Sequence, residues 1–141
     1  MSAKPAGTSV VILAAGLGKR MKSARPKVLH PVCGRPLLAW VIDQALSLSP
    51  ERILVVVGHG HDEVERALQA DGQLARVTLG RQEPQLGTGH ALQCCMPALG
   101  ANPGRVVVLY GDMPLLEPDS LAELVAAHAD RAADGVALLT A

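Results

Sequence analysis

Positive charge is concentrated in one short stretch of the chain, directly after its first apolar run. Positions 13–27 hold five basic residues and no acidic residue, and Gly16 and Gly18 interrupt the start of the stretch. Glycines leave backbone N–H groups open to an anion, and basic side chains can neutralise phosphate charge in a transition state. The stretch therefore predicts a polyphosphate site in which Arg20 and Lys27 stabilise charge. The alternative is a basic surface loop without a ligand.

Two widespread phosphate-binding motifs are excluded by inspection. The chain contains no GxxxxGK[ST] loop. The GxGxxG dinucleotide fingerprint fails at Met21, where its third glycine should stand. A nucleotide site in this stretch must therefore use some other arrangement.

Two glutamines precede a glycine-rich turn further along the chain. Gln82 and Gln85 stand just before Gly87-Thr88-Gly89. A primary amide offers both a donor and an acceptor, so it is suited to the edge of a nucleobase, and the turn lets backbone approach a ligand. The segment therefore favours a nucleobase site. An ordinary capped helix with a polar first turn is the alternative.

A carboxylate follows the most hydrophobic run of the sequence, in Tyr110-Gly111-Asp112. Mg²⁺ commonly uses one or two carboxylates together with substrate phosphates and water, so Asp112 is the candidate metal ligand. The alternative is an aspartate that starts a turn before a proline. His59 and His61 could also bind a metal, but a solvated loop is favoured for them.

The elements that must position these residues alternate along the chain. Short apolar runs predict strands at residues 9–13, 52–57, 76–79, 106–110 and 136–140. Helices are predicted between them at 36–47, 62–70, around 90–96 and at 121–129, with a loop over 16–35. Asp62 is the expected cap of the second helix, and Ser120 with Glu123 is spaced as a capping box for the last.

This β-α-β-α-β-α-β-α-β order predicts an α/β fold with a Rossmann-like, open, mostly parallel sheet and helices on both faces. The three chemistry-bearing segments follow the first, third and fourth predicted strands. In such sheets, ligands bind outside the carboxyl ends of the strands. We therefore expect the three segments to meet in one site.

Composition limits the class of partner. The 141 residues suit one domain, the formal net charge is zero and the pI is about 7.0, so no nucleic acid or membrane partner is expected. No apolar run approaches a membrane span. Three cysteines without metal-ligand spacing predict reduced, mostly buried thiols and a cytoplasmic location.

Taken together, these motifs resemble the sugar-1-phosphate nucleotidyltransferase family. The family signature of a strand, Ala-Gly-x-Gly-x-Arg-Met and Pro-Lys falls on LAAGLGKRM and on Pro26-Lys27. The segments PKVLHPVCGRP, QLGTGHA and LYGDMPLL are similar to the pyrophosphorylase domain of the bacterial bifunctional N-acetylglucosamine-1-phosphate uridyltransferase/glucosamine-1-phosphate acetyltransferases. The resemblance covers nearly the whole chain from residue 9 and implies the nucleotide-diphospho-sugar transferase fold.

The resemblance also implies a set of site residues. Arg20 and Lys27 match the residues that assist the chemistry, and Asp112 matches the magnesium ligand. The implied nucleotide contacts are Leu13, Ala14, Ala15, Gly16, Lys27, Gln82, Gly87, Thr88, Tyr110, Gly111 and Asp112.

The implied reaction is uridylyl transfer from UTP to N-acetylglucosamine 1-phosphate, which gives UDP-N-acetylglucosamine and pyrophosphate with Mg²⁺ as cofactor. Its product serves peptidoglycan synthesis, and hence cell wall biogenesis and cell shape. Members of the family continue with a sugar-binding remainder and a left-handed β-helix acetyltransferase domain. These parts would carry the second metal ligand, and a homotrimer is expected of the full-length enzyme only.

We therefore expect a flexible N-terminus over residues 1–8 and the nucleotide-binding portion of a truncated transferase domain over 9–141. Such a fragment would hold the UTP and Mg²⁺ half-site and be incomplete for turnover. Two other functions stay open from the sequence. One is a related nucleotidyltransferase that uses another nucleoside triphosphate, and the other is a non-catalytic nucleotide-binding module.

Overall fold

A computed structural model of the chain describes residues 7–16, 22–129 and 135–136. Its central sheet contains four parallel strands in the order β5-β4-β1-β6. Their bounds are Thr8–Leu13 for β1, Arg52–Val57 for β4, Thr78–Arg81 for β5 and Arg105–Tyr110 for β6. The predicted open, parallel sheet is confirmed.

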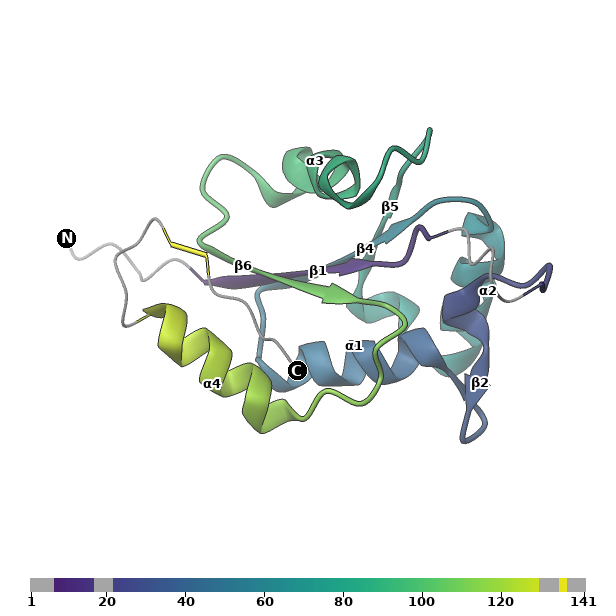
Figure 1. Cartoon of the computed structure of the whole chain (residues 1–141), viewed down its shortest axis with the longest axis horizontal. Helices are drawn as coiled ribbons and strands as arrows, with labels where there is room; N and C mark the ends of the chain where they lie inside the picture. The colour runs from purple at the N-terminus through teal and green to yellow at the C-terminus, as the bar shows by residue number, and fades with distance from the viewer. Residues whose placement is uncertain (1–6, 17–21, 130–134, 137–141) are drawn as a thin grey trace.

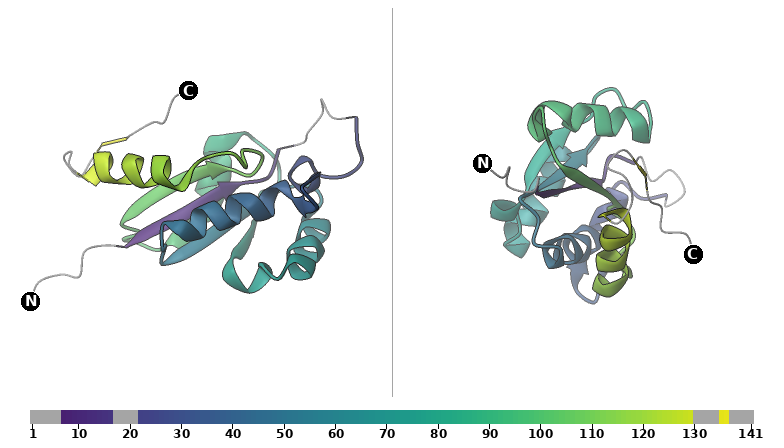
Figure 2. Two further views of the ribbon diagram at one scale, coloured as in Figure 1. Left: turned by 90° about the horizontal axis from the view of Figure 1, so that it is seen from below. Right: turned by 90° about the vertical axis from the view of Figure 1, so that its left-hand side faces the viewer.

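Helices cover both faces of this sheet, as predicted (Figures 1 and 2). One face is covered by α3, and the other by α1, α2 and α4. The bounds are Leu37–Ser47 for α1, His61–Asp71 for α2, Thr88–Leu99 for α3 and Pro118–Ala129 for α4. Among the described residues, every helix falls short of the length and hydropathy of a membrane-spanning segment.

The side chains of β1 point alternately to the two faces of the sheet, which explains why helices must cover both faces. Val10 and Ile12 belong to the core cluster shared with α1, α2 and α4, whereas Val11 packs into the cluster formed with α3. All three side chains are fully buried. A strand that is apolar on both sides can lie only in the middle of a sheet that is covered on both sides.

The strand order creates a switch point between β1 and β6. From β1 the chain moves outward to β4 and β5, then returns to the other side of β1 as β6. Leu13 pairs with Val56 on one side and with Tyr110 on the other, so the carboxyl ends of these strands lie level. Ligands of open α/β sheets bind at such a position.

The segment 16–35, predicted as loop, contains a short 3₁₀ helix and most of a short β-hairpin. Their bounds are Lys27–Leu29 for the 3₁₀ helix η2, Pro31–Val32 for β2 and Arg35–Pro36 for β3. The strands form an antiparallel hairpin whose two turn residues, Cys33 and Gly34, both have positive φ angles of 50° and 80°. Tight hairpin turns require this geometry, and strands of two residues are too short to give an alternating pattern.

An arginine anchors this hairpin to two helices. The Arg35 guanidinium donates to Asp43 in α1 at 2.7 Å and to both carboxylate oxygens of Asp71 in α2 at 3.1 and 2.8 Å. It also lies over the Trp40 ring, 4.7 Å from the centroid. Through this hydrogen bonding, Arg35 lowers the pKa of Asp71 below its usual value. The segment that carries Lys27 is thereby fixed against the helical layer.

The third predicted strand is displaced along the chain. Residues 76–79 were expected to be extended, but Leu74–Arg76 form the 3₁₀ helix η3 and β5 runs from Thr78 to Arg81. The displacement brings the end of β5 next to Gln82, whose N–H continues the ladder to the carbonyl of Val57. Most of the strand expected at 136–140 lies outside the described residues.

Two predicted helix caps are wrong. Asp62 lies in the first turn of α2, whose N-cap is Gly60 with a φ of 84°. Ser120 is the third residue of α4, because the helix already begins at Pro118. Proline is favoured at a first helical position since its missing N–H is not needed there. This preference outweighed the serine signal.

The three thiols differ in exposure. Cys95 is buried between α3 and the sheet. Burial, assisted by the charge of neighbouring Cys94, raises the pKa of its thiol to about 11. Cys94 is partly exposed, and Cys33, in the hairpin turn, is exposed. The expectation of mostly buried thiols is therefore wrong for Cys33. All three are free cysteines.

Candidate functional site

A cavity of about 320 Å³ lies at the carboxyl ends of β1, β5 and β6. It is lined by residues from the three segments that the sequence singled out. These are Leu13, Ala14, Ala15, Gly16, Lys27, Val28, Gln82, Gln85, Gly87, Thr88, Ala91, Tyr110 and Asp112. Ten of the eleven predicted nucleotide contacts are in this set, with Gly111 the exception.

The floor of the cavity is an extension of the parallel sheet. The N–H of Ala14 donates to the Val56 carbonyl at 2.8 Å, and the N–H of Gly111 donates to the Leu13 carbonyl at 2.9 Å. The ladder hydrogen bonds thus continue past the ends of the strands. The first loop residues after β1 and β6 are therefore held by the same kind of hydrogen bond as the strands.

Gly111, also predicted as a contact, packs against two lining residues and does not itself line the cavity. A Cβ atom at this position would lie 3.1 Å from Val28 Cγ1 and 3.3 Å from the Ala14 Cβ. The backbone after β6 can therefore approach the β1 loop only without a side chain there. Gly111 shapes the site by allowing this close approach.

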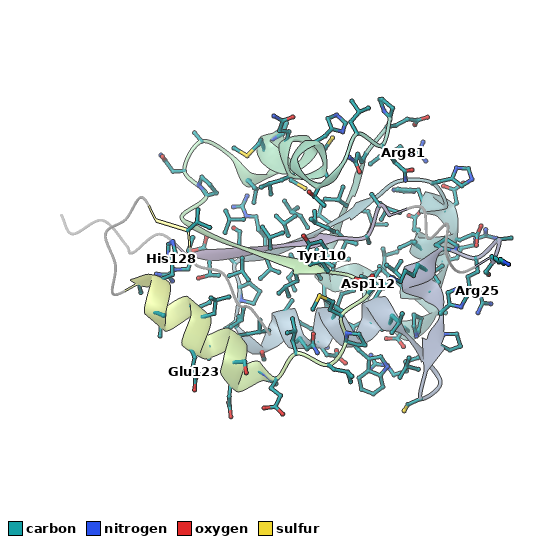
Figure 3. All side chains as sticks on the ribbon, in the orientation of Figure 1. Arg25, Arg81, Tyr110, Asp112, Glu123 and His128 are labelled. Carbon is teal, nitrogen blue, oxygen red and sulfur yellow. The ribbon has the colours of Figure 1, made fainter. Side chains whose placement is uncertain are left out.

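The carboxylate of Asp112 is already paired. Its Oδ2 accepts a hydrogen bond from Lys27 Nζ at 2.6 Å, and the two side chains are 30% and 42% exposed. Figure 3 shows Tyr110 and Asp112 at the carboxyl end of β6, while His128 lies at the opposite end of the strand. A half-exposed ion pair stabilises a fold only weakly, so a ligand can open it at little cost.

The donor set at Asp112 fits a hard divalent cation. A carboxylate on a firm backbone, at the edge of a cavity wide enough for phosphate oxygens and water, is the usual protein contribution to a Mg²⁺ site. Lys27 Nζ donates a hydrogen bond to Oδ2, one of the two carboxylate oxygens that could bind a cation. The same ammonium could turn to a phosphate group once the metal has replaced it.

The two glutamines are held in different ways. Gln82 is 3% exposed, and its Nε2 donates to the Gly87 carbonyl at 2.9 Å and lies 3.0 Å from His90 Nδ1. Gln85 Nε2 donates to the Ala15 carbonyl across the cavity. Gln85 thereby ties the segment after β5 to the loop after β1. Sequence reasoning noted Gln85 as an amide but did not include it among the contacts.

Two further lining residues, Val28 and Ala91, were missed by sequence reasoning. Both are small apolar side chains with no chemical signature, so only their positions next to Lys27 and Thr88 could have indicated them. Arg20, the other predicted catalytic residue, lies outside the described residues.

A larger cavity, of about 550 Å³, lies beside the start of α2. His61, Asp62 and Glu65 in the first turns of α2 present ligand atoms within 4.8 Å of one another, and Asp62 also lies 3.8 Å from Arg81. Exposed acidic groups of this kind are common without an ion. Of the predicted site residues, only Gln82 reaches this cavity. Three separate segments with suitable chemistry converge on the smaller cavity instead.

Comparison with known sequences gives a consistent result. Residues 10–141 match the family model described as MobA-like NTP transferase domain. "Bifunctional protein GlmU" of Sorangium cellulosum is 49% identical over 146 residues, which is 100% of this chain and 30% of that protein. The protein of the same name from Paraburkholderia phymatum is 52% identical over 94% of this chain and 27% of its own length. The chain thus spans less than a third of these relatives.

Solved structures share the fold at lower identity. Rv0371C of Mycobacterium tuberculosis H37Rv, in complex with manganese, superposes with a TM-score of 0.69 at 20% identity, covering 85% of this chain and 58% of the other. HddC of Yersinia pseudotuberculosis, complexed with GMP-PN, gives a TM-score of 0.68 at 23% identity, covering 86% and 54%.

Proposed function

Because the chain belongs to the MobA-like NTP transferase domain family, we propose that its cavity is the nucleotide half of a uridylyltransferase site. The proposed overall reaction converts UTP and N-acetylglucosamine 1-phosphate into UDP-N-acetylglucosamine and pyrophosphate. The GlmU relatives, identical at about half of the aligned positions, support this choice of reaction. Since the chain spans less than a third of them, our proposal for the chain itself is the binding of UTP with Mg²⁺.

One observation carries the proposal. Residues from three separate segments, picked out by their chemistry, line a single cavity at the switch point of the sheet. Its volume of about 320 Å³ lies at the lower end of the usual range for ligand pockets, roughly 300–1,000 Å³. That size suits a nucleoside, with the phosphates extending toward Gly16 and Lys27.

We assign three roles within this site. Gln82, Gly87 and Thr88 contact the uracil and the loop after β1 contacts the nucleotide backbone. Lys27 neutralises phosphate charge, and Arg20 is proposed for the same task on the resemblance of its motif. Asp112 holds Mg²⁺, a metal that would neutralise the charge that develops on the phosphate oxygens. A solved neighbour of the same fold was obtained with manganese, which is in keeping with a divalent cation.

The proposed step needs no protein nucleophile. A phosphate oxygen of the sugar phosphate forms a bond to the α-phosphorus of UTP. The bond from that phosphorus to the bridging oxygen of the β-phosphate breaks, and pyrophosphate leaves with the electron pair. Catalysis then consists of positioning and charge stabilisation, which Lys27 and Arg20 supply.

Calorimetric titration of the four nucleoside triphosphates in the presence of Mg²⁺ tests the proposal. We expect UTP to bind, and to bind at least about tenfold more tightly than CTP, GTP or ATP. Absence of UTP binding by a folded chain would contradict the proposal. Preference for CTP, GTP or ATP would instead indicate a related nucleotidyltransferase.

The cellular setting follows from the proposed product. UDP-N-acetylglucosamine made here would enter peptidoglycan synthesis, and the three free cysteines suit a cytoplasmic location. A non-catalytic nucleotide-binding module would bind UTP equally well. Pyrophosphate release, measured after the sugar-binding remainder of a relative is added, separates that alternative from the transferase.

A further inference from the structure

We propose that His90 is a positioning residue that fixes the amide of Gln82, so that the site accepts a base with an N–H at the contact point and rejects cytosine. The inference rests on the proposed nucleotide site. His90 is the third residue of α3, in the same first turn as the lining residues Thr88 and Ala91. It does not line the cavity itself.

The orientation of the Gln82 amide is determined by its neighbours. A backbone carbonyl only accepts hydrogen bonds, so the group that lies 2.9 Å from the Gly87 oxygen must be the amide nitrogen. The amide can therefore not be reversed without losing this hydrogen bond. The backbone is also fixed, because the N–H of Gln82 donates to the Val57 carbonyl at 2.8 Å.

The second proton of the amide is used by His90. One Nε2 proton is donated to the Gly87 carbonyl, and the other points at His90 Nδ1, 3.0 Å from Nε2. Nδ1 must then be an acceptor, so the imidazole is neutral and carries its proton on Nε2. The Cys94 sulfur, one turn along the helix, lies 3.9 Å from Nε2 and 4.0 Å from Nδ1, so it contacts the ring without selecting either nitrogen. The contact with Gln82 is therefore the one that determines which ring nitrogen carries the proton.

This arrangement leaves the amide only one function to offer a ligand. Both protons are used inside the protein, while Oε1 accepts no hydrogen bond from the described residues. A base that presents an N–H, such as the imide of uracil, can donate to that oxygen. Cytosine presents a lone pair at the same ring position, and two acceptors facing each other in a buried site are unfavourable.

Without His90, the amide loses one of its two anchors. Gly87 O also accepts from the Ala91 N–H at 3.0 Å, so it keeps a partner if the amide turns away. The amide could then rotate and donate to cytosine. The preference for UTP over CTP should therefore fall more than the affinity for UTP itself. A purely structural role of His90 would not produce this pattern.

Two nearly isosteric variants test the inference. His90→Leu removes the acceptor, whereas His90→Asn places an amide oxygen where Nδ1 stood. We expect the affinity ratio of UTP over CTP, measured by calorimetry with Mg²⁺, to fall about tenfold in His90→Leu and to recover in His90→Asn. His59→Phe, on an exposed loop, is the control and should leave the ratio unchanged.

The outcomes are separable from those of the proposed function. A wild-type chain that binds neither nucleotide contradicts the proposed function. A chain that binds UTP, but whose ratio stays within about twofold in folded His90→Leu, contradicts only the role of His90. The tautomer gives a test that needs no variant. Nitrogen NMR of the free wild-type chain should show the His90 proton on Nε2, and a proton on Nδ1 would overturn the inference.

Discussion

Replacing Asp112 by asparagine should lower the affinity for UTP in the presence of Mg²⁺ at least roughly a hundredfold, because changes that merely support a metal ligand already cost about 10–100-fold. Asparagine keeps the shape of the side chain but removes the charge that a divalent cation needs. The variant should therefore bind UTP about as weakly with Mg²⁺ as without it. Calorimetry with and without the metal measures the difference.

Two further variants make this result specific. Asp119→Asn changes an exposed aspartate at the start of α4 and should leave UTP binding unaltered. Lys27→Met removes the ammonium 2.6 Å from Asp112 Oδ2, so it should strengthen the binding of Mg²⁺ alone while it weakens that of UTP. An Asp112→Asn chain that keeps its full response to Mg²⁺ would show that the metal binds elsewhere.

Leu38→Ala should lower the free energy of unfolding by about 3 kcal/mol. Leu38 lies in α1, is fully buried and packs in the same cluster as Val10 and Ile12 of the central strand. Truncation removes three carbons and leaves a cavity that the rigid sheet above cannot fill. For a chain of this size, such a loss is a large part of the total stability.

Leu115→Ala is the matched control, because Leu115 follows β6 and is 88% exposed. The same substitution should change the free energy of unfolding by less than about 0.5 kcal/mol there. Urea denaturation of the three proteins, at equal chain concentration, provides the comparison. Equal losses in both variants would contradict the described packing of α1 against the sheet.

The elements predicted best are those whose sequence carries one strong physical signal. The strand Arg52–Val57 was predicted with its observed bounds, because a β-branched run closed by a glycine has few alternatives. The helix after Pro36 followed from a clear apolar stripe, and α2 ends at Asp71, one residue beyond the predicted end. Burial on both faces of the sheet makes such signals strong.

The misses concern local choices between weak signals. Asp62 and Ser120 were good caps by residue type, but α2 begins one residue and α4 three residues before the predicted starts. The hairpin around Cys33 and Gly34 depends on positive φ angles, and a cysteine in a sequence does not indicate such an angle. Its attachment through Arg35 depends on Asp71, 36 residues away, and local patterns cannot predict such a contact.

The candidate site was predictable in composition but not in geometry. Convergence of the segments followed from the rule that strand ends meet at one edge of a parallel sheet. The pairing of Lys27 with Asp112 and the contact of Gln82 with His90 did not, because each depends on rotamers set by tertiary packing. Gly111 does not line the cavity, and its contact with the nucleotide stays a prediction.

We expect UTP to bind in the cavity at the carboxyl ends of β1, β5 and β6. Amide NMR shifts on addition of UTP with Mg²⁺ test this claim most directly, because they locate the ligand as well as detect it. We expect the largest shifts at Gly16, Gly87, Thr88 and Asp112, with little change around Arg66 in the larger cavity beside α2. Shifts concentrated in the His61 to Arg66 region instead would contradict the account.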